Sequence, residues 1–79
     1  MSKIQYSEFE RKYITQIGKR IAELRHESGY TQEELAELMK ISARALSDIE
    51  NGKSCPNSIM IYRVADALHM SVKEFYDFL

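Results

Sequence analysis

Residues 42–52 combine charged and hydrogen-bonding side chains at helical spacing. Ala43, Arg44, Ser47, Asp48 and Asn51 stand at i, i+1, i+4, i+5 and i+8, which places them on one face of a helix. An arginine can donate two parallel hydrogen bonds to a guanine, an aspartate can accept one from a cytosine, and an alanine can pack on a thymine methyl group. The stretch therefore indicates either a base-reading helix in the major groove of DNA or a packed helix whose polar face is simply solvated.

Side chains for catalysis or metal binding are scarce. Cys55 is the single cysteine, and His26 and His69 stand alone, so no Cys-x-x-Cys or His-x-x-His spacing occurs. The sequence also lacks a nucleophile–base–orienter set and a phosphate-cradling glycine loop. We therefore expect no enzymatic activity, no metal and no cofactor. One cysteine excludes an internal disulfide and indicates a reducing compartment, with Cys55 as a free loop thiol.

The composition is that of one small globular domain spanning residues 1–79. The chain has 79 residues, of which 44% are hydrophobic and 29% charged, so its core must be modest. The formal net charge is −1, and any nucleic-acid binding must therefore depend on a local basic patch. No apolar run approaches the roughly 18 residues of a membrane span, and residues 1–6 lack a signal-peptide core. We expect a cytoplasmic protein with no membrane partner.

The elements that position these side chains are expected to be five short helices, which makes the fold class all-α. Three helix starts carry a capping box, in which a hydroxyl and a glutamate three residues later satisfy each other's backbone amides. They are Ser7–Glu10, Thr31–Glu34 and Ser71–Glu74. Ser42 and Asn57 are the expected N-caps of the other two helices, and Gly29 ends the first. Gly18 lies inside the first helix, at a cost of about 1 kcal/mol against alanine.

Residues 31–51 are predicted to form a helix-turn-helix. Its two helices must cross closely, so the positions between them must be apolar and one of them small. The apolar residues of this seam are Leu35, Met39, Ile41, Leu46 and Ile49. Ala36 is the small residue that lets the second helix approach.

Residues 18–75 resemble the lambda-repressor-like (Xre/Cro-type) helix-turn-helix family in a single register. The matching motifs are Ile21…Leu24-Arg25, Thr31-Gln32-Glu33-Glu34-Leu35-Ala36, Ile41-Ser42, Ile49-Glu50-Asn51-Gly52-Lys53, Pro56 and Val64-Ala65-Asp66-Ala67-Leu68. The resemblance implies a compact five-helix DNA-binding domain of a transcriptional regulator. Such regulators are repressors, restriction controllers or antitoxins, and they commonly bind palindromic operators in double-stranded DNA as homodimers.

The resemblance also implies roles for individual residues. The DNA-binding set would be Thr31, Gln32, Lys40, Ser42, Ala43, Arg44, Ser47, Asp48, Asn51 and Lys53. Within it, Gln32 and the helix N-terminus beside it would hold a phosphate, as the helix dipole favours. Arg25 and Glu50 stand where the family has a salt bridge between the first helix and the end of the recognition helix. The alternative for this pair is two solvated charges.

The chain departs from the family pattern at several positions. Lys40 and His69 replace glycines, and both can adopt a left-handed conformation at some cost. Ala43 and Asp48 are weak base readers, and Asp48 repels phosphate. We expect Arg44 to contact a guanine and Asp48 to orient Arg44, the alternative being an exposed i,i+4 pair without a role in readout.

The two ends of the chain lie outside this resemblance. Residues 1–17 would extend the first helix, with Phe9 and Tyr13 packing on the last helix. That last helix is expected at 71–79, where Phe75, Phe78 and Leu79 would form a homodimer interface.

A second function stays open. Asp48, the acidic balance and the small number of cations near the motif also fit a protein-interaction module. An antitoxin-type subunit, which uses the same fold to bind a partner protein, would combine the two functions.

Overall fold

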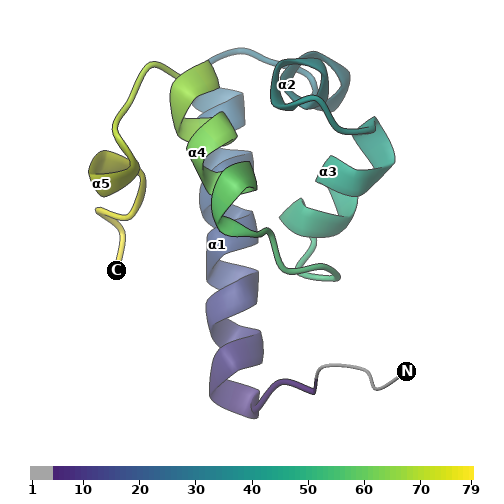
Figure 1. Cartoon of the computed structure of the whole chain (residues 1–79), viewed down its shortest axis with the longest axis vertical. Helices are drawn as coiled ribbons and strands as arrows, with labels where there is room; N and C mark the ends of the chain where they lie inside the picture. The colour runs from purple at the N-terminus through teal and green to yellow at the C-terminus, as the bar shows by residue number, and fades with distance from the viewer. Residues whose placement is uncertain (1–4) are drawn as a thin grey trace.

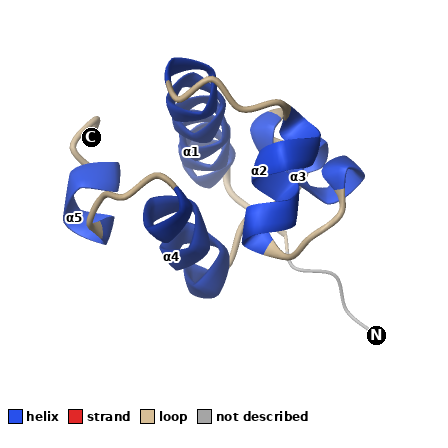
Figure 2. Ribbon diagram, turned by 90° about the horizontal axis from the view of Figure 1, so that it is seen from above, coloured by secondary structure: helices blue, strands red, loops and turns tan. Residues whose placement is uncertain are grey.

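The computed structural model describes residues 5–79, and within this range the chain forms five α-helices and no strand. The helices are α1 (Glu8–Glu27), α2 (Gln32–Met39), α3 (Ala43–Glu50), α4 (Ser58–Ala67) and α5 (Val72–Phe75). The helix pair α2 and α3 lies on one side of the long helix α1, and α5 lies on the other side, with α4 between them (Figures 1 and 2). The predicted all-α, five-helix fold is confirmed.

Each helix begins at the cap that the sequence predicts. Complete capping boxes start α1, α2 and α5, and the hydroxyl of Ser42 and the amide oxygen of Asn57 accept backbone N–H groups at the starts of α3 and α4. Thr31 shows the geometry of a box: its amide donates to Glu34 Oε1 at 2.8 Å, and its hydroxyl accepts from the Glu34 amide at 3.1 Å. These caps satisfy amides that the first turn of a helix otherwise leaves without partners.

The last helix is shorter than expected. We predicted a helix over 71–79, but α5 ends at Phe75 and a turn follows. Arg20, on α1, donates Nε–H to the Phe75 carbonyl at 2.9 Å and Nη2–H to the Glu74 carbonyl at 3.1 Å. Its guanidinium also lies 5.5 Å from the centre of the Phe78 ring. The Phe75 carbonyl thus accepts from Arg20 instead of from a further helical amide, and the Glu74 carbonyl accepts both from Arg20 and from the Asp77 amide of the turn.

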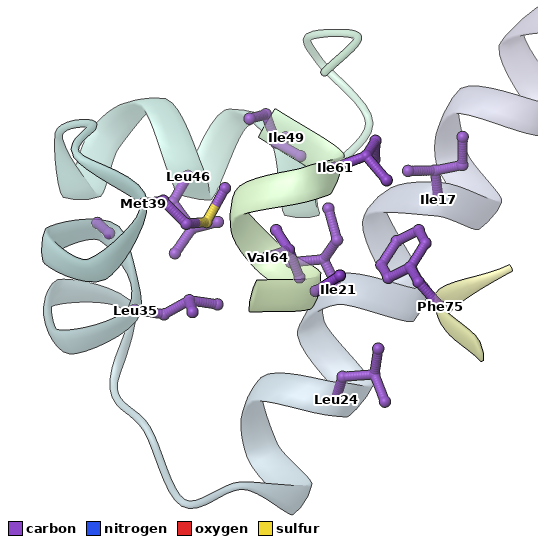
Figure 3. Close-up of a cluster of buried hydrophobic side chains, with 12 residues drawn as sticks. Ile17, Ile21, Leu24, Leu35, Met39, Leu46, Ile49, Ile61, Val64 and Phe75 are labelled. Atoms are coloured by element: carbon purple, nitrogen blue, oxygen red, sulfur yellow. The ribbon is translucent and has the colours of Figure 1, made fainter. Parts of the chain in front are cut away.

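The core joins all five helices. Its buried residues are Ile17, Ile21, Leu24, Leu35, Ala36, Met39, Leu46, Ile49, Ile61, Val64, Ala65 and Phe75 (Figure 3). All predicted seam residues of the helix-turn-helix belong to it except Ile41, which is half-buried and packs against it. Phe75 is 0% exposed and packs in the core. Its prediction as a dimer contact is therefore wrong, because a side chain with no exposed surface cannot contact a second subunit.

Gly18 is required by the packing of α1 against α3. A Cβ atom at this position would overlap the Ile49 carbonyl oxygen and lie 3.0 Å from that of Glu50. From the sequence, Gly18 is expected only to lower the stability of the helix relative to alanine. In the fold it is the position at which the backbone of α1 approaches the end of α3.

The N-terminal part of α1 is only partly covered. Phe9 is 82% exposed, so the expectation that it packs on the last helix is wrong, because α1 projects beyond the other helices at that end (Figure 1). Tyr13 is 42% exposed and lies beside Tyr76, directly after α5. Burial, reinforced by Tyr13, raises the pKa of the Tyr76 hydroxyl. Residues 1–4 of the predicted extension lie outside the described residues.

Candidate nucleic-acid interface

Helix α3 has one buried face and one open face. Leu46 and Ile49 are 0% and 4% exposed and hold the inner face in the core. On the outer face Arg44 is exposed, and Ser47 and Asp48 are half-buried. The predicted base-facing positions therefore lie on the face of α3 opposite its core contacts.

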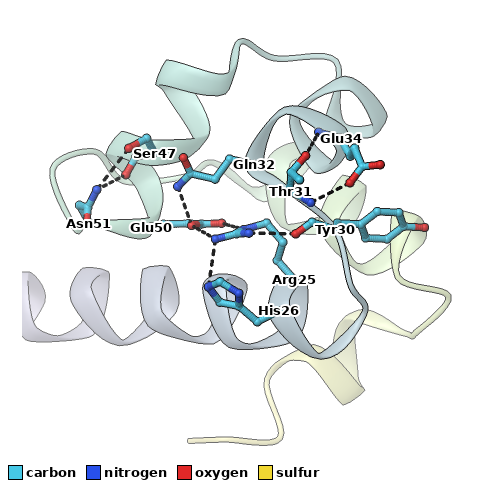
Figure 4. Close-up of polar contacts among 9 residues, drawn as sticks. All are labelled: Arg25, His26, Tyr30, Thr31, Gln32, Glu34, Ser47, Glu50 and Asn51. Atoms are coloured by element: carbon cyan, nitrogen blue, oxygen red, sulfur yellow. Dashed lines mark hydrogen bonds and ion pairs between the residues drawn. The ribbon is translucent and has the colours of Figure 1, made fainter.

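Asn51 is held at the end of this surface. Its Nδ2 donates to the Ser47 carbonyl at 2.9 Å and lies 3.3 Å from the Ser47 hydroxyl (Figure 4). The Ser47 hydroxyl accepts in this arrangement, so its own proton stays available to an external acceptor. Asn51 Oδ1 also stays available. The two side chains thus form a pre-ordered polar edge on the outer face of α3.

Arg44 and Asp48 do not form the pair that we expected. Arg25–Glu50 is the one ion pair within residues 5–79, so Asp48 does not orient Arg44 in this structure. The i,i+4 spacing allows the contact but does not enforce it, because an exposed pair gains little over hydration of the separate charges. Arg44 extends from the surface without an internal partner among these residues.

A buried polar network connects α1 and α2 to the end of α3. Arg25 donates Nε–H to Glu50 Oε2 at 2.7 Å and Nη2–H to Glu50 Oε1 at 3.0 Å, with side-chain exposures of 9% and 5%. Its Nη1–H reaches the Tyr30 carbonyl at 2.9 Å, and its Nη2 lies 3.2 Å from His26 Nε2 (Figure 4). This bidentate geometry anchors the recognition helix to α1 through a charge-assisted pair.

Gln32 extends this network to the protein surface. Its Nε2 donates to Glu50 Oε1 at 2.9 Å, which leaves a second N–H and the amide oxygen for another partner. The residue opens α2, beside an open depression of about 610 Å³ lined by Arg25, Thr31, Gln32, Glu33 and Ala43. The depression lies between the N-terminal ends of α2 and α3. Its cation and backbone amides favour an anion, while the Glu33 carboxylate opposes one.

The turn between α2 and α3 needs a left-handed residue. Lys40 takes this conformation, with φ of 60°, and His69 takes it after α4, with φ of 59°. Arg63, on α4, donates Nη1–H to the Met39 carbonyl at 3.0 Å and so satisfies the end of α2. The sequence analysis did not identify Arg63 or Arg20, because no local pattern marks which distant carbonyl a basic side chain will reach.

The remaining predicted contacts lie around these elements. Ser42 is the exposed N-cap of α3, and Lys53 is exposed in the loop that follows the helix. The Lys53 amide donates to the Asp48 carbonyl at 2.8 Å, which holds this loop against the end of α3. Within residues 5–79 no group of three His, Cys, Asp or Glu side chains could hold a metal ion. None of the helices in that range could span a membrane.

These elements define a helix-turn-helix with an open recognition helix, which is a DNA-binding fold. Residues 21–75 match the helix-turn-helix family HTH_3, and the chain belongs to this family of DNA-binding transcriptional regulators. It is 40% identical over 57 residues to the uncharacterized HTH-type transcriptional regulator YazB of Bacillus subtilis, covering 72% of this chain and 83% of that protein. It is also 40% identical over 55 residues to the regulator y4dJ of Sinorhizobium fredii, covering 70% and 71%.

Solved structures show the same fold. The restriction-modification controller protein C.AhdI from Aeromonas hydrophila superposes with a TM-score of 0.78 at 28% identity, over 82% of this chain and 98% of that one. The clp gene regulator ClgR from Corynebacterium glutamicum superposes with a TM-score of 0.74 at 31% identity, over 77% and 65%. The predicted family is confirmed.

Proposed function

We propose that this protein is a sequence-specific transcriptional repressor that binds a palindromic operator as a homodimer, with α3 in the major groove. The observation that carries the proposal is the division of α3 into a buried face and an open polar face. Leu46 and Ile49 fix the helix to the core, so it presents Arg44, Ser47 and Asn51 outward as a rigid set. The similarity to a restriction-modification controller and a clp gene regulator supports a role in controlling transcription.

The roles of the surface residues follow from their chemistry. Arg44 reads a guanine through two parallel hydrogen bonds, and Ser47 donates to a neighbouring base or phosphate. Gln32, positioned by Glu50, donates its second N–H to a phosphate next to the start of α2. Thr31, Lys40, Ser42, Asn51 and Lys53 form the surrounding backbone contacts, and Ala43 packs on a thymine methyl group. Asp48 accepts from a cytosine amino group, since it does not orient Arg44.

A homodimer would supply the second recognition helix that a palindrome requires. Ile59 and Tyr62, on the outer side of α4, are 54% and 58% exposed, and Leu79 is 67% exposed. Phe78 is half-buried beside Arg20. These apolar residues support an interface across α4 and the C-terminal turn. Sedimentation equilibrium at micromolar concentration tests this, and a monomer both free and on DNA would exclude the homodimer.

A second candidate is a protein-interaction module, including an antitoxin-type subunit. Asp48 favours it, because an unpaired carboxylate on the recognition face opposes phosphate and suits a basic protein partner. The two candidates differ in what this face recognises. A DNA-binding assay on variants of this face therefore distinguishes the two candidate functions.

The experiment is a selection of random duplex DNA at two stated salt concentrations, followed by affinity measurements on the selected site and a scrambled duplex. Arg44→Ala should lower operator affinity by about 1–3 kcal/mol and relax preference at one base pair. Asp48→Ala should raise the affinity for scrambled DNA and reduce the ratio of operator affinity to scrambled-DNA affinity. Lys73→Ala, an exposed cation on α5, is the control and should change neither. If wild type enriches no sequence and both face variants behave like the control, the protein-binding function replaces DNA reading.

A further inference from the structure

A hollow lies at the junction of the N-terminal part of α1 with the loop after α3. It has a volume of about 390 Å³, and its polar walls include Tyr6, Arg11, Thr15, Lys53 and Ser54. The hollow is only partly inside the family match, because Tyr6, Arg11 and Thr15 precede residue 21 whereas Lys53 and Ser54 lie within it. The helix-turn-helix pattern therefore supplies one wall of the hollow, and the extension of α1 supplies the other.

The side chains around the hollow suit an anion. Arg11 and Lys53 supply two positive charges, and Tyr6, Thr15 and Ser54 supply hydroxyl donors. No carboxylate from the described part of the chain lines the walls. Within residues 5–79 neither Arg11 nor Lys53 forms an ion pair or a side-chain hydrogen bond. Two cations facing one cavity without a counter-charge in it repel each other, and an anion between them would remove this repulsion. In a chain with a net charge of −1 this concentration of positive charge is local.

The floor of the hollow is closely packed. Gly52 has φ of +73°, and a Cβ atom there would lie 2.9 Å from the Thr15 hydroxyl, so the loop backbone rests directly on α1. The Lys53 amide, bonded to the Asp48 carbonyl at 2.8 Å, ties the same loop to α3. Arg11, on α1, and Lys53, in the loop that is bonded to α3, therefore stand on opposite sides of the hollow.

The hollow lies directly beyond the C-terminal end of the recognition helix. Figure 1 shows α1 continuing past the α3–α4 loop, so the N-terminal turns of α1 lie beyond the C-terminal end of α3. When α3 occupies a groove, the sugar-phosphate backbone that borders the groove runs past the end of the helix. A backbone phosphate is thus the anion that would come closest to Arg11 and Lys53.

We propose that this hollow is a phosphate-binding site in which Arg11 and Thr15, from the extension of α1, join Lys53 and Ser54 to hold the DNA backbone beyond the base-reading surface. The proposal rests on the proposed DNA-binding function. It adds Arg11 and Thr15, which precede the family match, to the backbone contact proposed above for Lys53, and this contact is distinct from the one at Gln32. Such a contact would add affinity on every sequence and no preference among bases.

The test compares Arg11→Ala with Lys12→Ala in the full chain. Both variants remove one positive charge from the same turn of α1, but Lys12 does not line the hollow. Affinity for a random-sequence duplex is measured at several salt concentrations. Arg11→Ala should reduce the slope of log K against log salt by about 1, while Lys12→Ala leaves the slope unchanged. On a shortened duplex that ends where α3 ends, and so offers no phosphate to the hollow, the two variants should have the same salt slope.

A second measurement distinguishes a DNA phosphate from a small phosphorylated ligand, and failure of the phosphate site from failure of the DNA-binding function. Inorganic phosphate is titrated while the amide resonances of Thr15 and residues 52–54 are followed by NMR in wild type and Arg11→Ala. If the wild-type protein binds no DNA, the proposed DNA-binding function is wrong. Phosphate-dependent resonance shifts that are present in wild type and absent in Arg11→Ala would then still establish a site for a small phosphorylated ligand. If Arg11→Ala and Lys12→Ala have equal salt slopes but the phosphate-dependent shifts are absent in Arg11→Ala, the hollow is likewise a site for a small phosphorylated ligand and not for the DNA backbone. Equal slopes for both variants with no phosphate-dependent shift would overturn the site.

Discussion

Replacing Glu50 by alanine should remove a large fraction of this protein's free energy of unfolding. The carboxylate accepts three hydrogen bonds, from Arg25 Nε at 2.7 Å, Arg25 Nη2 at 3.0 Å and Gln32 Nε2 at 2.9 Å. Its side chain is 5% exposed and that of Arg25 is 9% exposed, so water cannot replace the lost acceptor easily. Glu50→Ala therefore leaves a buried guanidinium without its counter-charge.

The magnitude follows from this geometry. Breaking a buried ion pair by removing one partner costs about 3–5 kcal/mol. Arg25 retains the Tyr30 carbonyl at 2.9 Å, which places the expected loss near the lower end, at about 3 kcal/mol. A domain of this size has a total stability of about 4–12 kcal/mol, so a loss of about 3 kcal/mol removes between roughly a quarter and three quarters of it.

Urea unfolding followed by far-UV circular dichroism measures this loss. Glu37→Ala is the matched control, because Glu37 is an exposed glutamate of α2 without a side-chain hydrogen bond among the described residues, and it should change stability by less than about 0.5 kcal/mol. The double replacement Arg25→Met with Glu50→Leu should recover most of the loss, since no buried charge is left without a partner. A loss below about 1 kcal/mol for Glu50→Ala would refute the reasoning and reduce the network to an ordinary surface pair.

Three further predictions concern single positions. Gly18→Ala should lower stability by about 1–3 kcal/mol through overlap with the Ile49 carbonyl, and a thermal melt showing the increase usual for Gly-to-Ala in a helix would contradict the close approach. Lys40→Gly should raise stability by about 1 kcal/mol by relieving a left-handed non-glycine residue, and an unchanged urea midpoint would mean that the turn is unstrained. The hydrogen bond from the Ser71 amide lowers the pKa of Glu74, so the capping box stabilises α5 above the ordinary pKa of a glutamate and this contribution disappears as the pH falls through the lowered value. Glu74→Gln should flatten the acid side of the stability–pH curve, and an unaltered curve would exclude a role for this box.

The starts of the helices could be predicted because their chemistry is local. Each cap joins groups no more than three residues apart, so the spacing of Thr31 and Glu34 or of Ser71 and Glu74 contains the whole interaction. The left-handed turn at Lys40 could be anticipated in the same way, from a position where the family has glycine. The open face of α3 follows from helical periodicity once its apolar stripe is assigned to the core.

What the sequence alone left undecided is burial and pairing between distant segments. Phe9 and Phe75 are the same residue type near the two ends of the chain, yet one is 82% exposed and the other 0%. The difference arises because α1 projects past its neighbours at Phe9, while Phe75 is enclosed by the core and by Arg20, 55 residues away in sequence. Local hydrogen bonds are specified within a few residues, whereas burial depends on which elements the whole fold brings opposite one another. For the same reason the hollow at Arg11 could not be read from the order of residues and appears only when α1 and the α3–α4 loop are packed together.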